Sequence, residues 1–204
     1  MQRPGKIICV GRNYAAHAKE LGNDVPKEPL LFFKPPTSVI SAGTPIELPP
    51  GSGRVDFEGE IGVVIGATLR RVDEATARAG IRSLIAANDV SSRDWQNNDG
   101  QWARAKGCDT FLPLGQEAPV PADLDAVTVV TRHNGVEKQR ATGADMVFKI
   151  PFLLAHISKY MTLEPGDLLL TGTPAGVAQL APGDTVEVEL VGLSSVKNPV
   201  AAGR

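Results

Sequence analysis

The stretch Val-Asp-Phe-Glu-Gly-Glu-Ile-Gly-Val-Val-Ile at residues 55–65 decides the fold of this chain. Its β-branched and aromatic residues are typical of a strand, and it is the clearest strand of the sequence. Because successive side chains of a strand point to opposite faces, Asp56, Glu58 and Glu60 would share one face. The Cα atoms of Glu58 and Glu60 would then lie about 6.5–7 Å apart. Two carboxylates so close repel each other unless a cation lies between them.

A cation at this strand would be a hard one, because carboxylate oxygens without soft partners favour Mg²⁺, Mn²⁺ or Ca²⁺. Asp89, near the end of an apolar segment at residues 81–90, can supply a third carboxylate. The sequence leaves two other interpretations open. The acids can lie on a solvated strand face, and Asp89 can cap a short helix over residues 91–97.

Turn-forming residues divide the rest of the chain into short elements. The 21 Gly and 16 Pro residues are spread along its length, which favours many short strands over long helices. Further strands are expected at residues 6–10, 30–33, 45–48, 168–171 and 185–191, and Asn134-Gly135 predicts a hairpin between 127–133 and 137–141. Helices are expected at residues 15–21, 73–79 and 150–161, and the type of the segment 81–90 stays open. The fold class is mostly β with a few short helices.

Size and charge narrow the class of protein. A chain of 204 residues with 42% hydrophobic residues suits one globular domain, residues 1–204. The net charge of -2 argues against nucleic-acid and membrane-surface partners, which usually require a basic patch. No stretch approaches the ~20 apolar residues that span a bilayer, so a cytoplasmic protein is expected. Cys9 and Cys108 match no metal or disulfide framework and are interpreted as reduced core thiols.

A histidine and a glutamate three residues apart offer acid–base chemistry. His17 and Glu20 fall on one face of the helix expected at residues 15–21. A carboxylate raises the basicity of a neighbouring imidazole and fixes its tautomer, which suits a general base acting on water. A solvated surface pair is the alternative. His133, in the hairpin, and His156, in the last helix, are interpreted as structural.

Basic residues and one tight turn offer binding groups for an anionic substrate. Four basic residues can bind a carboxylate, although a single basic residue usually lies on the surface: Arg12, Lys34, Arg93 and Lys106. Lys106 precedes Gly107, where the chain is expected to turn sharply. The segment Leu170-Thr171-Gly172-Thr173-Pro174 ends a strand in a polar turn that can aim N–H and hydroxyl groups at an anion.

Taken in order, these segments resemble the fumarylacetoacetate hydrolase family over nearly the whole chain. No single motif is decisive, but seven in this order are. The motifs are Gly11-Arg12-Asn13-Tyr14 with His17 and Glu20, Phe32-Phe33-Lys34-Pro35, Phe57-Glu58-Gly59-Glu60, Asn88-Asp89 with Arg93 and Gln96, Lys106-Gly107, Asp145-Met146 and Thr171-Gly172-Thr173-Pro174. The short length resembles the small acylpyruvase and oxaloacetate decarboxylase branch, without the additional N-terminal domain of the animal fumarylacetoacetases.

The resemblance implies a fold of rolled, packed mixed β-sheets, assembled as a homodimer. It implies that Glu58, Glu60 and Asp89 hold Mg²⁺ or Mn²⁺, with Ca²⁺ as an alternative. The His17–Glu20 pair would lie on a mobile lid, within the segment of about residues 6–24. Further residues match the oxo-acid site or lie beside it: Arg12, Lys34, Arg93, Gln96, Lys106, Gly172 and Thr173. Trp95 and Gln116 depart from the family pattern, which leaves the identity of the substrate open.

Two enzymatic functions and one non-enzymatic function follow from the resemblance. The favoured one is hydrolysis of a C–C bond in a 2,4-dioxo acid such as an acylpyruvate, with the cation as Lewis acid for the departing enolate. His17, oriented by Glu20, would activate water, while Lys106 binds or polarises the substrate. The second is decarboxylation or tautomerisation of a dicarboxylic 2-oxo acid, either oxaloacetate or a hydroxymuconate derivative from homoprotocatechuate breakdown. The third is a metal-dependent oxo-acid binding protein without turnover.

Overall fold

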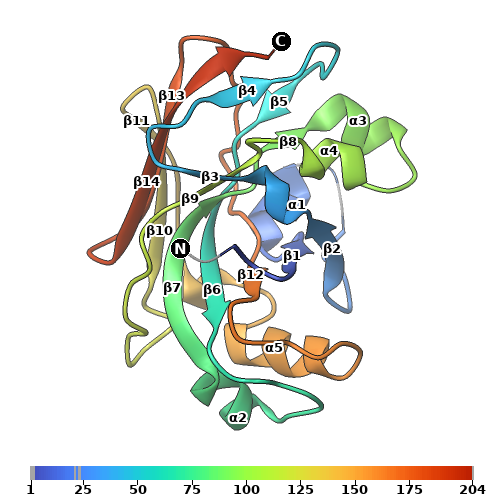
Figure 1. Cartoon of the computed structure of the whole chain (residues 1–204), viewed down its shortest axis with the longest axis vertical. Coiled ribbons are helices and arrows are strands. Elements are labelled where there is room, and N and C mark those ends of the chain that lie inside the picture. Colours follow the sequence, from blue (N-terminus) through green and yellow to red (C-terminus); the bar gives the residue numbers. More distant parts are fainter. Residues whose placement is uncertain (1–2, 21, 23, 204) are drawn as a thin grey trace.

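The chain forms two large, curled β-sheets with short helices around them (Figure 1). The computed structural model describes residues 3–20, 22 and 24–203. Leu21 and Asn23, at the expected end of the first helix, lie outside the described residues. Strands dominate, so the predicted mostly β class is confirmed. The strands are β1 Ile7–Gly11, β2 Leu30–Lys34, β3 Val39–Ser41, β4 Ile46–Leu48, β5 Val55–Asp56, β6 Gly59–Ile65, β7 Ile81–Asn88, β8 Ser91–Ser92, β9 Leu112–Leu114, β10 Thr128–His133, β11 Val136–Thr142, β12 Leu168–Leu170, β13 Thr185–Leu190 and β14 Ser194–Ala202.

The larger sheet carries the segments that build the site. Its seven strands run in the order β2-β1-β12-β6-β7-β9-β3, and five more form the sheet β11-β10-β13-β14-β4. Strands β1 and β12 are parallel, whereas β6 is antiparallel to both β12 and β7. The carboxyl ends of β1, β12 and β7 therefore meet the amino end of β6 at one edge of the sheet.

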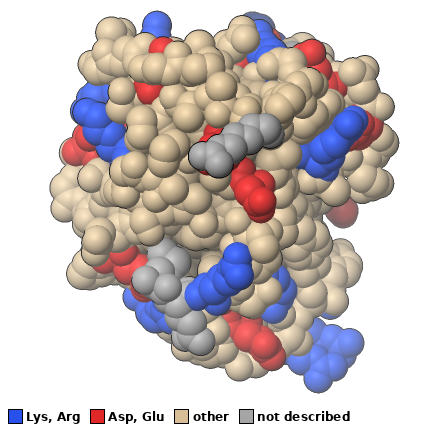
Figure 2. Space-filling view, turned by 45° about the horizontal axis from the view of Figure 1, so that its top comes forward, with Lys and Arg blue, Asp and Glu red and all other residues tan. Residues whose placement is uncertain are grey.

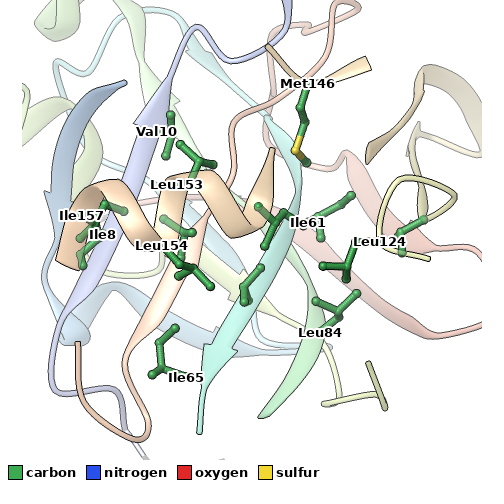
Figure 3. Close-up of a cluster of buried hydrophobic side chains, with 14 of the residues drawn as sticks. Ile8, Val10, Ile61, Ile65, Leu84, Leu124, Met146, Leu153, Leu154 and Ile157 are labelled. Atoms are coloured by element: carbon green, nitrogen blue, oxygen red, sulfur yellow. The ribbon is translucent and has the colours of Figure 1, made fainter. Parts of the chain in front are cut away.

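Helices lie at opposite ends of the molecule. Helices α2 Glu74–Ala79 and α5 Ile150–Ser158 are at one end, and α3 Arg93–Asn98 and α4 Ala103–Gly107 are near the other, with α1 Ala15–Glu20 between them in Figure 1. Side chains of α5 pack on the larger sheet, where Leu153 and Ile157 face Ile8 and Ile61 (Figure 3). The opposite face of the same sheet is also buried, by a second cluster that includes Ile7. Burial on both faces explains why β1 and β12 are continuous apolar runs.

The central stretch at residues 55–65 is not one strand, as predicted, but two. Strand β5 pairs with β8 in a separate two-stranded sheet, and β6 begins at Gly59 within the large sheet. The chain changes sheets at Phe57 and Glu58, and Phe57 fills a third apolar cluster. Asp56 therefore belongs to a different sheet from Glu60, although both line the same cavity.

Other expected elements are confirmed or corrected. Asn134 and Gly135 adopt φ angles of 51° and 79°, as a type I′ hairpin turn requires. Residues 81–90 contain strand β7, and the helix expected to reach residue 161 ends at Ser158. Strand β14 was not predicted from the sequence. It contains lysine, asparagine and proline, but alternate side chains are buried, as in a strand with one solvated face.

Surface charge and helix length test the expectation that neither nucleic acid nor a membrane is a partner. On the face in Figure 2, acidic and basic side chains are interspersed. Within the described residues, each helix is too short or too polar to cross a membrane.

Candidate active site

A cavity of about 500 Å³ opens at the edge of the large sheet where the four strand ends meet. Segments far apart in the sequence line it. They include the end of β1, helix α1, the β5–β6 connection, the end of β7 and helices α3 and α4. The lining includes nine of the twelve residues predicted for the site, namely Arg12, His17, Glu58, Glu60, Asp89, Arg93, Gln96, Lys106 and Thr173. The other three, Glu20, Lys34 and Gly172, each bond to one of these nine.

Three buried carboxylates form a cluster in this cavity. Glu58, Glu60 and Asp89 each offer an oxygen atom within 4.8 Å of the others. All three side chains are buried, so the solvated-face interpretation is wrong. The backbone fixes their spacing, because Asp89 N donates to Glu58 O at 2.8 Å and Glu58 N donates to the Asn88 side chain at 2.9 Å. The cap of helix α3 is Ser92, so Asp89 does not have that alternative role.

Two buried lysines compensate part of this negative charge. Lys106 Nζ donates to Glu58 Oε2 at 2.7 Å and to Asp89 Oδ2 at 2.8 Å. Lys34 Nζ donates to Asp89 Oδ1 at 2.7 Å and to Val90 O at 3.2 Å. Lys106 lies in α4 and not in a sharp turn, and neither lysine is a surface residue. Lys34 lies behind Asp89 and is not among the lining residues, whereas Lys106 reaches the cavity itself.

Glu60 is the carboxylate without a cationic partner among the described residues. Its Oε2 accepts a hydrogen bond from Gly172 N at 2.7 Å. Burial raises the pKa of Glu60 well above its ordinary value, and the charges of Asp89 and Glu58 raise it further. By contrast, burial would raise the pKa of Glu58, but Lys106 and Arg93 outweigh burial and hold it below its usual range.

These donors fit a divalent cation. The potential ligand atoms are hard oxygens, three of them can converge on one point, and one carboxylate has no countercharge in the part of the chain that the structure describes. Each carboxylate oxygen has two lone pairs, so the bonds from lysine do not exhaust the ligands. The geometry is compatible with Mg²⁺, Mn²⁺ or Ca²⁺ and does not select among them.

Arg93 is held by three side chains at the cavity wall. Its Nε donates to Asp56 Oδ2 at 2.8 Å, its Nη1 donates to Gln96 Oε1 at 2.8 Å, and its Nη2 lies 2.7 Å from Glu58 Oε1. Asp56 is fully buried and also accepts two bonds from Arg54, at 2.8 and 3.0 Å. The sequence placed Asp56 with the other acids, but it orients arginines instead.

The His17–Glu20 pair is partly buried and not a solvated surface contact. His17 is 4% exposed, and its Nδ1 lies 3.1 Å from Glu20 Oε2. Its other nitrogen, Nε2, lies 3.9 Å from Glu58 Oε1. Gly176 N donates to both carboxylate oxygens of Glu20, at 3.0 and 3.3 Å. Helix α1 is thereby attached to the loop that follows the Gly172-Thr173 turn.

Aromatic residues complete the walls. Phe32 and Trp102 line the cavity and pack edge to face with ring centroids 5.3 Å apart. The other predicted structural residues behave as expected. His133 lies 2.9 Å from Asp184, His156 stacks on Phe152, and both cysteines are free thiols, although Cys108 is only half-buried.

Comparisons with known proteins agree with this geometry. The family model described as "Fumarylacetoacetate (FAA) hydrolase C-terminal" matches residues 6–201. A mitochondrial oxaloacetate tautomerase of Arabidopsis thaliana is 41% identical over 198 residues, which cover 94% of this chain and 90% of that protein. A mitochondrial oxaloacetate decarboxylase of Dictyostelium discoideum is 42% identical over 197 residues, covering 93% and 90%. The crystal structure of a 5-carboxymethyl-2-hydroxymuconate delta-isomerase from Mycobacterium smegmatis superposes with a TM-score of 0.91 at 42% identity, covering 99% and 80%.

Curled mixed sheets with a buried carboxylate cluster at one end are the setting of the site in this chain, and the relatives that match over nearly its whole length include enzymes named for oxaloacetate chemistry. The chain belongs to the fumarylacetoacetate hydrolase family, as its motifs indicate. The names of the three relatives agree with the second enzymatic alternative, decarboxylation or isomerisation. They do not confirm C–C bond hydrolysis.

Proposed function

We propose that this protein is a divalent-metal-dependent enzyme that decarboxylates or tautomerises a dicarboxylic 2-oxo acid of the oxaloacetate type. The observation that carries the proposal is the cluster of Glu58, Glu60 and Asp89, buried and open to a cavity that also contains His17. Two relatives that match more than nine tenths of the chain are named for these two reactions. Both reactions require negative charge to develop on the oxygen of the 2-oxo group.

The three carboxylates would hold the cation, which when bound would act as a Lewis acid toward the 2-oxo acid. Lys106 adds a fixed positive charge at the same place, because Glu58 and Asp89 hold its ammonium group in the cavity. Such preorganised charge stabilises a developing oxyanion without reorganisation during the reaction. Arg93 and Gln96 are bonded to each other and also line the cavity, and they would orient the substrate carboxylate.

His17 is suited to move a proton at Nε2. A carboxylate can only accept, so the contact with Glu20 assigns the proton of the neutral His17 imidazole to Nδ1. This tautomer leaves Nε2 free to accept a proton. A tautomerase needs such a group to remove a proton from the carbon beside the oxo group. Decarboxylation needs no base for that step, so His17 contributes less to it.

Arg12 supports a substrate with a second carboxylate. It lines the cavity with a φ of 58°, an uncommon conformation for a residue other than glycine. Within the described residues, its guanidinium forms no hydrogen bond or ion pair, whereas Arg54, Arg93 and Lys106 are all paired. An arginine without a partner in the cavity can bind the distal carboxylate of a dicarboxylic acid in a bidentate manner.

A substrate panel tests the proposal. Oxaloacetate, a hydroxymuconate derivative and a monocarboxylic acylpyruvate are incubated with Mg²⁺ or Mn²⁺, and carbon dioxide, the keto–enol ratio and pyruvate are measured. We expect metal-dependent turnover of the dicarboxylic acids, and Arg12→Met should raise KM for them while leaving the acylpyruvate unaffected. Arg70→Met, at an exposed position outside the cavity, is the control. Full activity in excess chelator, or no turnover of any dicarboxylic acid, would contradict the proposal.

Hydrolysis of an acylpyruvate is the second candidate, and the buried His17 with its partner Glu20 favours it. A base held in this manner is what activation of water requires. If hydrolysis is the native reaction, His17→Ala should lower it by a factor on the order of 10²–10⁴ and lower oxaloacetate decarboxylation less. Equal losses for the two reactions in this variant would remove the argument for hydrolysis. If the panel shows binding of the acids but turnover of none, the protein is the non-catalytic oxo-acid binding protein of the third alternative.

The homodimer remains a prediction from the family resemblance. Light scattering during size-exclusion chromatography should give twice the mass of one 21.5 kDa chain.

A further inference from the structure

Strand β11 has one buried side chain, and it is polar. Gln139 is 1% exposed, whereas all the remaining side chains of Val136–Thr142 are exposed or half-buried. The register between β10 and β11 is irregular at this point, because Thr131 is paired with Gln139 but Arg132 is paired with Glu137. An irregularity of this kind leaves one residue unpaired and re-aims a neighbouring side chain. Here Lys138 is the residue without a partner in the register, and Gln139 next to it is regularly paired, opposite the buried Thr131.

All three bonds of the Gln139 amide reach the active-site segments. Its Oε1 accepts a hydrogen bond at 3.0 Å from the N–H of Gly59, the residue between Glu58 and Glu60. Its Nε2 donates to Thr173 Oγ1 at 2.8 Å and to Pro174 O at 2.7 Å. Because a carbonyl oxygen only accepts and a peptide N–H only donates, these partners fix the orientation of the amide.

A fourth bond closes the arrangement. Thr173 Oγ1 donates to Gly59 O at 2.9 Å, so Gln139, Thr173 and Gly59 form a ring of three hydrogen bonds. The hydroxyl hydrogen of Thr173 is committed to Gly59 O, which fixes the rotation of this cavity-lining group. Both backbone polar groups of Gly59 are also fixed, and with them the spacing of the carboxylates on either side.

We propose that Gln139 is a positioning residue that holds the Glu58–Glu60 peptide and the Thr173 turn in the geometry the site needs. The inference rests on the proposed metal role of Glu58 and Glu60. Gln139 lines no part of the cavity and acts through the backbone of Gly59 and the hydroxyl of Thr173. A hydrogen-bonded partner behind a metal ligand typically changes metal affinity or activity by about 10–100-fold when it is removed.

Thr131 provides a matched control. It lies opposite Gln139 in the register of the same two strands, is fully buried and also packs against Gly59. Its hydroxyl forms no hydrogen bond in the described part of the chain. Thr131→Val keeps the shape and removes no bond, so it reports the effect of altered packing alone.

The test compares Gln139→Met with Thr131→Val in two measurements. The first is Mn²⁺ affinity, followed through the electron paramagnetic resonance signal of free Mn²⁺. The second is hydrogen exchange of the Gly59 amide by NMR in the metal-free protein. Gln139→Met should weaken Mn²⁺ binding about 10–100-fold and accelerate exchange of the Gly59 amide. Thr131→Val should stay within about twofold of the unmodified protein in both.

The outcomes separate this inference from the proposed function. If Gln139→Met matches Thr131→Val in both measurements, Gln139 is not a positioning residue. If the unmodified protein binds no Mn²⁺, the metal proposal fails, and Gly59 exchange still decides the role of Gln139. Should Gln139→Met not fold, Gln139→Glu keeps the acceptor for Gly59 and loses the two amide donors. Gln139→Glu should then raise KM for the dicarboxylic acid that is turned over, because the Thr173 turn is no longer held, while Mn²⁺ affinity is retained. An unchanged KM would show that Gln139 does not position Thr173.

Discussion

Replacing Lys34 by methionine should destabilise the protein through Asp89 and leave substrate contacts intact. The Lys34 side chain is fully buried, and its ammonium group donates to Asp89 Oδ1 at 2.7 Å. Methionine keeps most of the stem and removes the charge. Removing one partner of a buried ion pair costs about 3–5 kcal/mol, because the other charge stays buried without compensation. Asp89 keeps its bond to Lys106 at 2.8 Å, so the lower end of that range is expected.

The magnitude converts to a measurable shift in Tm. For a chain of this size, 1 kcal/mol changes Tm by about 2–4 °C, so a loss of about 3 kcal/mol lowers it by about 6–12 °C. A divalent cation should recover part of the loss, because it supplies positive charge to the same carboxylate. At 100 times its Kd a ligand adds about 2.7 kcal/mol of stability to any protein that binds it, so the informative quantity is the difference between variants.

The assay is thermal unfolding in chelator and in excess Mn²⁺, with Lys138→Met as control. Lys138 lies on β11, where it is exposed and forms no ion pair within the described residues. We expect Mn²⁺ to raise Tm more in Lys34→Met than in the control, because the variant has lost a cation that competes for Asp89. A chelated Lys34→Met that melts within about 2 °C of the control would refute the reasoning. Lys34 would then contribute no net stabilisation to the cluster.

Three further changes test the rest of the site. Glu60→Gln should raise Tm in chelator at neutral pH, because burial raises the pKa of Glu60 and so makes burying this carboxyl unfavourable, whereas glutamine is neutral in both states. The substitution should also abolish the rise on adding Mn²⁺, and a metal response equal to that of the unmodified protein would show that Glu60 is not a ligand. Lys106→Met should lower kcat/KM for every substrate that is turned over, and an unchanged value across the panel would leave Lys106 with a structural role only. Gly172→Ala should cost more than about 1 kcal/mol in urea unfolding, because φ is 96° there and a Cβ atom would lie 2.8 Å from Asn13 Cβ; an unchanged unfolding midpoint would contradict this strain.

Local sequence patterns predicted the site well wherever neighbours in the chain are also neighbours in space. Glu58 and Glu60 flank one glycine, and His17 and Glu20 lie one helical turn apart, so spacing alone brought each pair together. Asp89 was a candidate third carboxylate from its place after an apolar segment, with a helix cap as the alternative, and the family motif favoured the carboxylate role. Its neighbourhood with Glu58 depends on the long-range pairing of β6 with β7, where Gly59 lies opposite Asn88. The hairpin was predictable for the same local reason, since Asn134-Gly135 carries its turn type in two residues.

The parts that sequence analysis missed depend on contacts between distant segments. Asp56 alternates with Glu58 and Glu60, but the change of sheet at Phe57 turns it toward Arg93. Gln139 lies in a strand whose other side chains are exposed or half-buried, and its bond to Gly59 depends on how this strand packs against a segment 80 residues away. Neither position carries a local signal that distinguishes it from an ordinary polar residue.

The arrangement of buried charges separates folding from metal binding. Glu58 and Asp89 are paired with protein cations. Glu58 contacts Arg93 and Lys106. Asp89 contacts Lys34 and Lys106. These carboxylates can therefore be buried before any ion arrives, since a buried charge is tolerated when it is paired and hydrogen-bonded. Among the described residues, Glu60 has only a backbone N–H as hydrogen-bond donor, so its burial in charged form is unfavourable without a cation. If the three carboxylates hold a cation as proposed, two of the ligands are preorganised without it, and Glu60 is the one whose burial the cation would compensate.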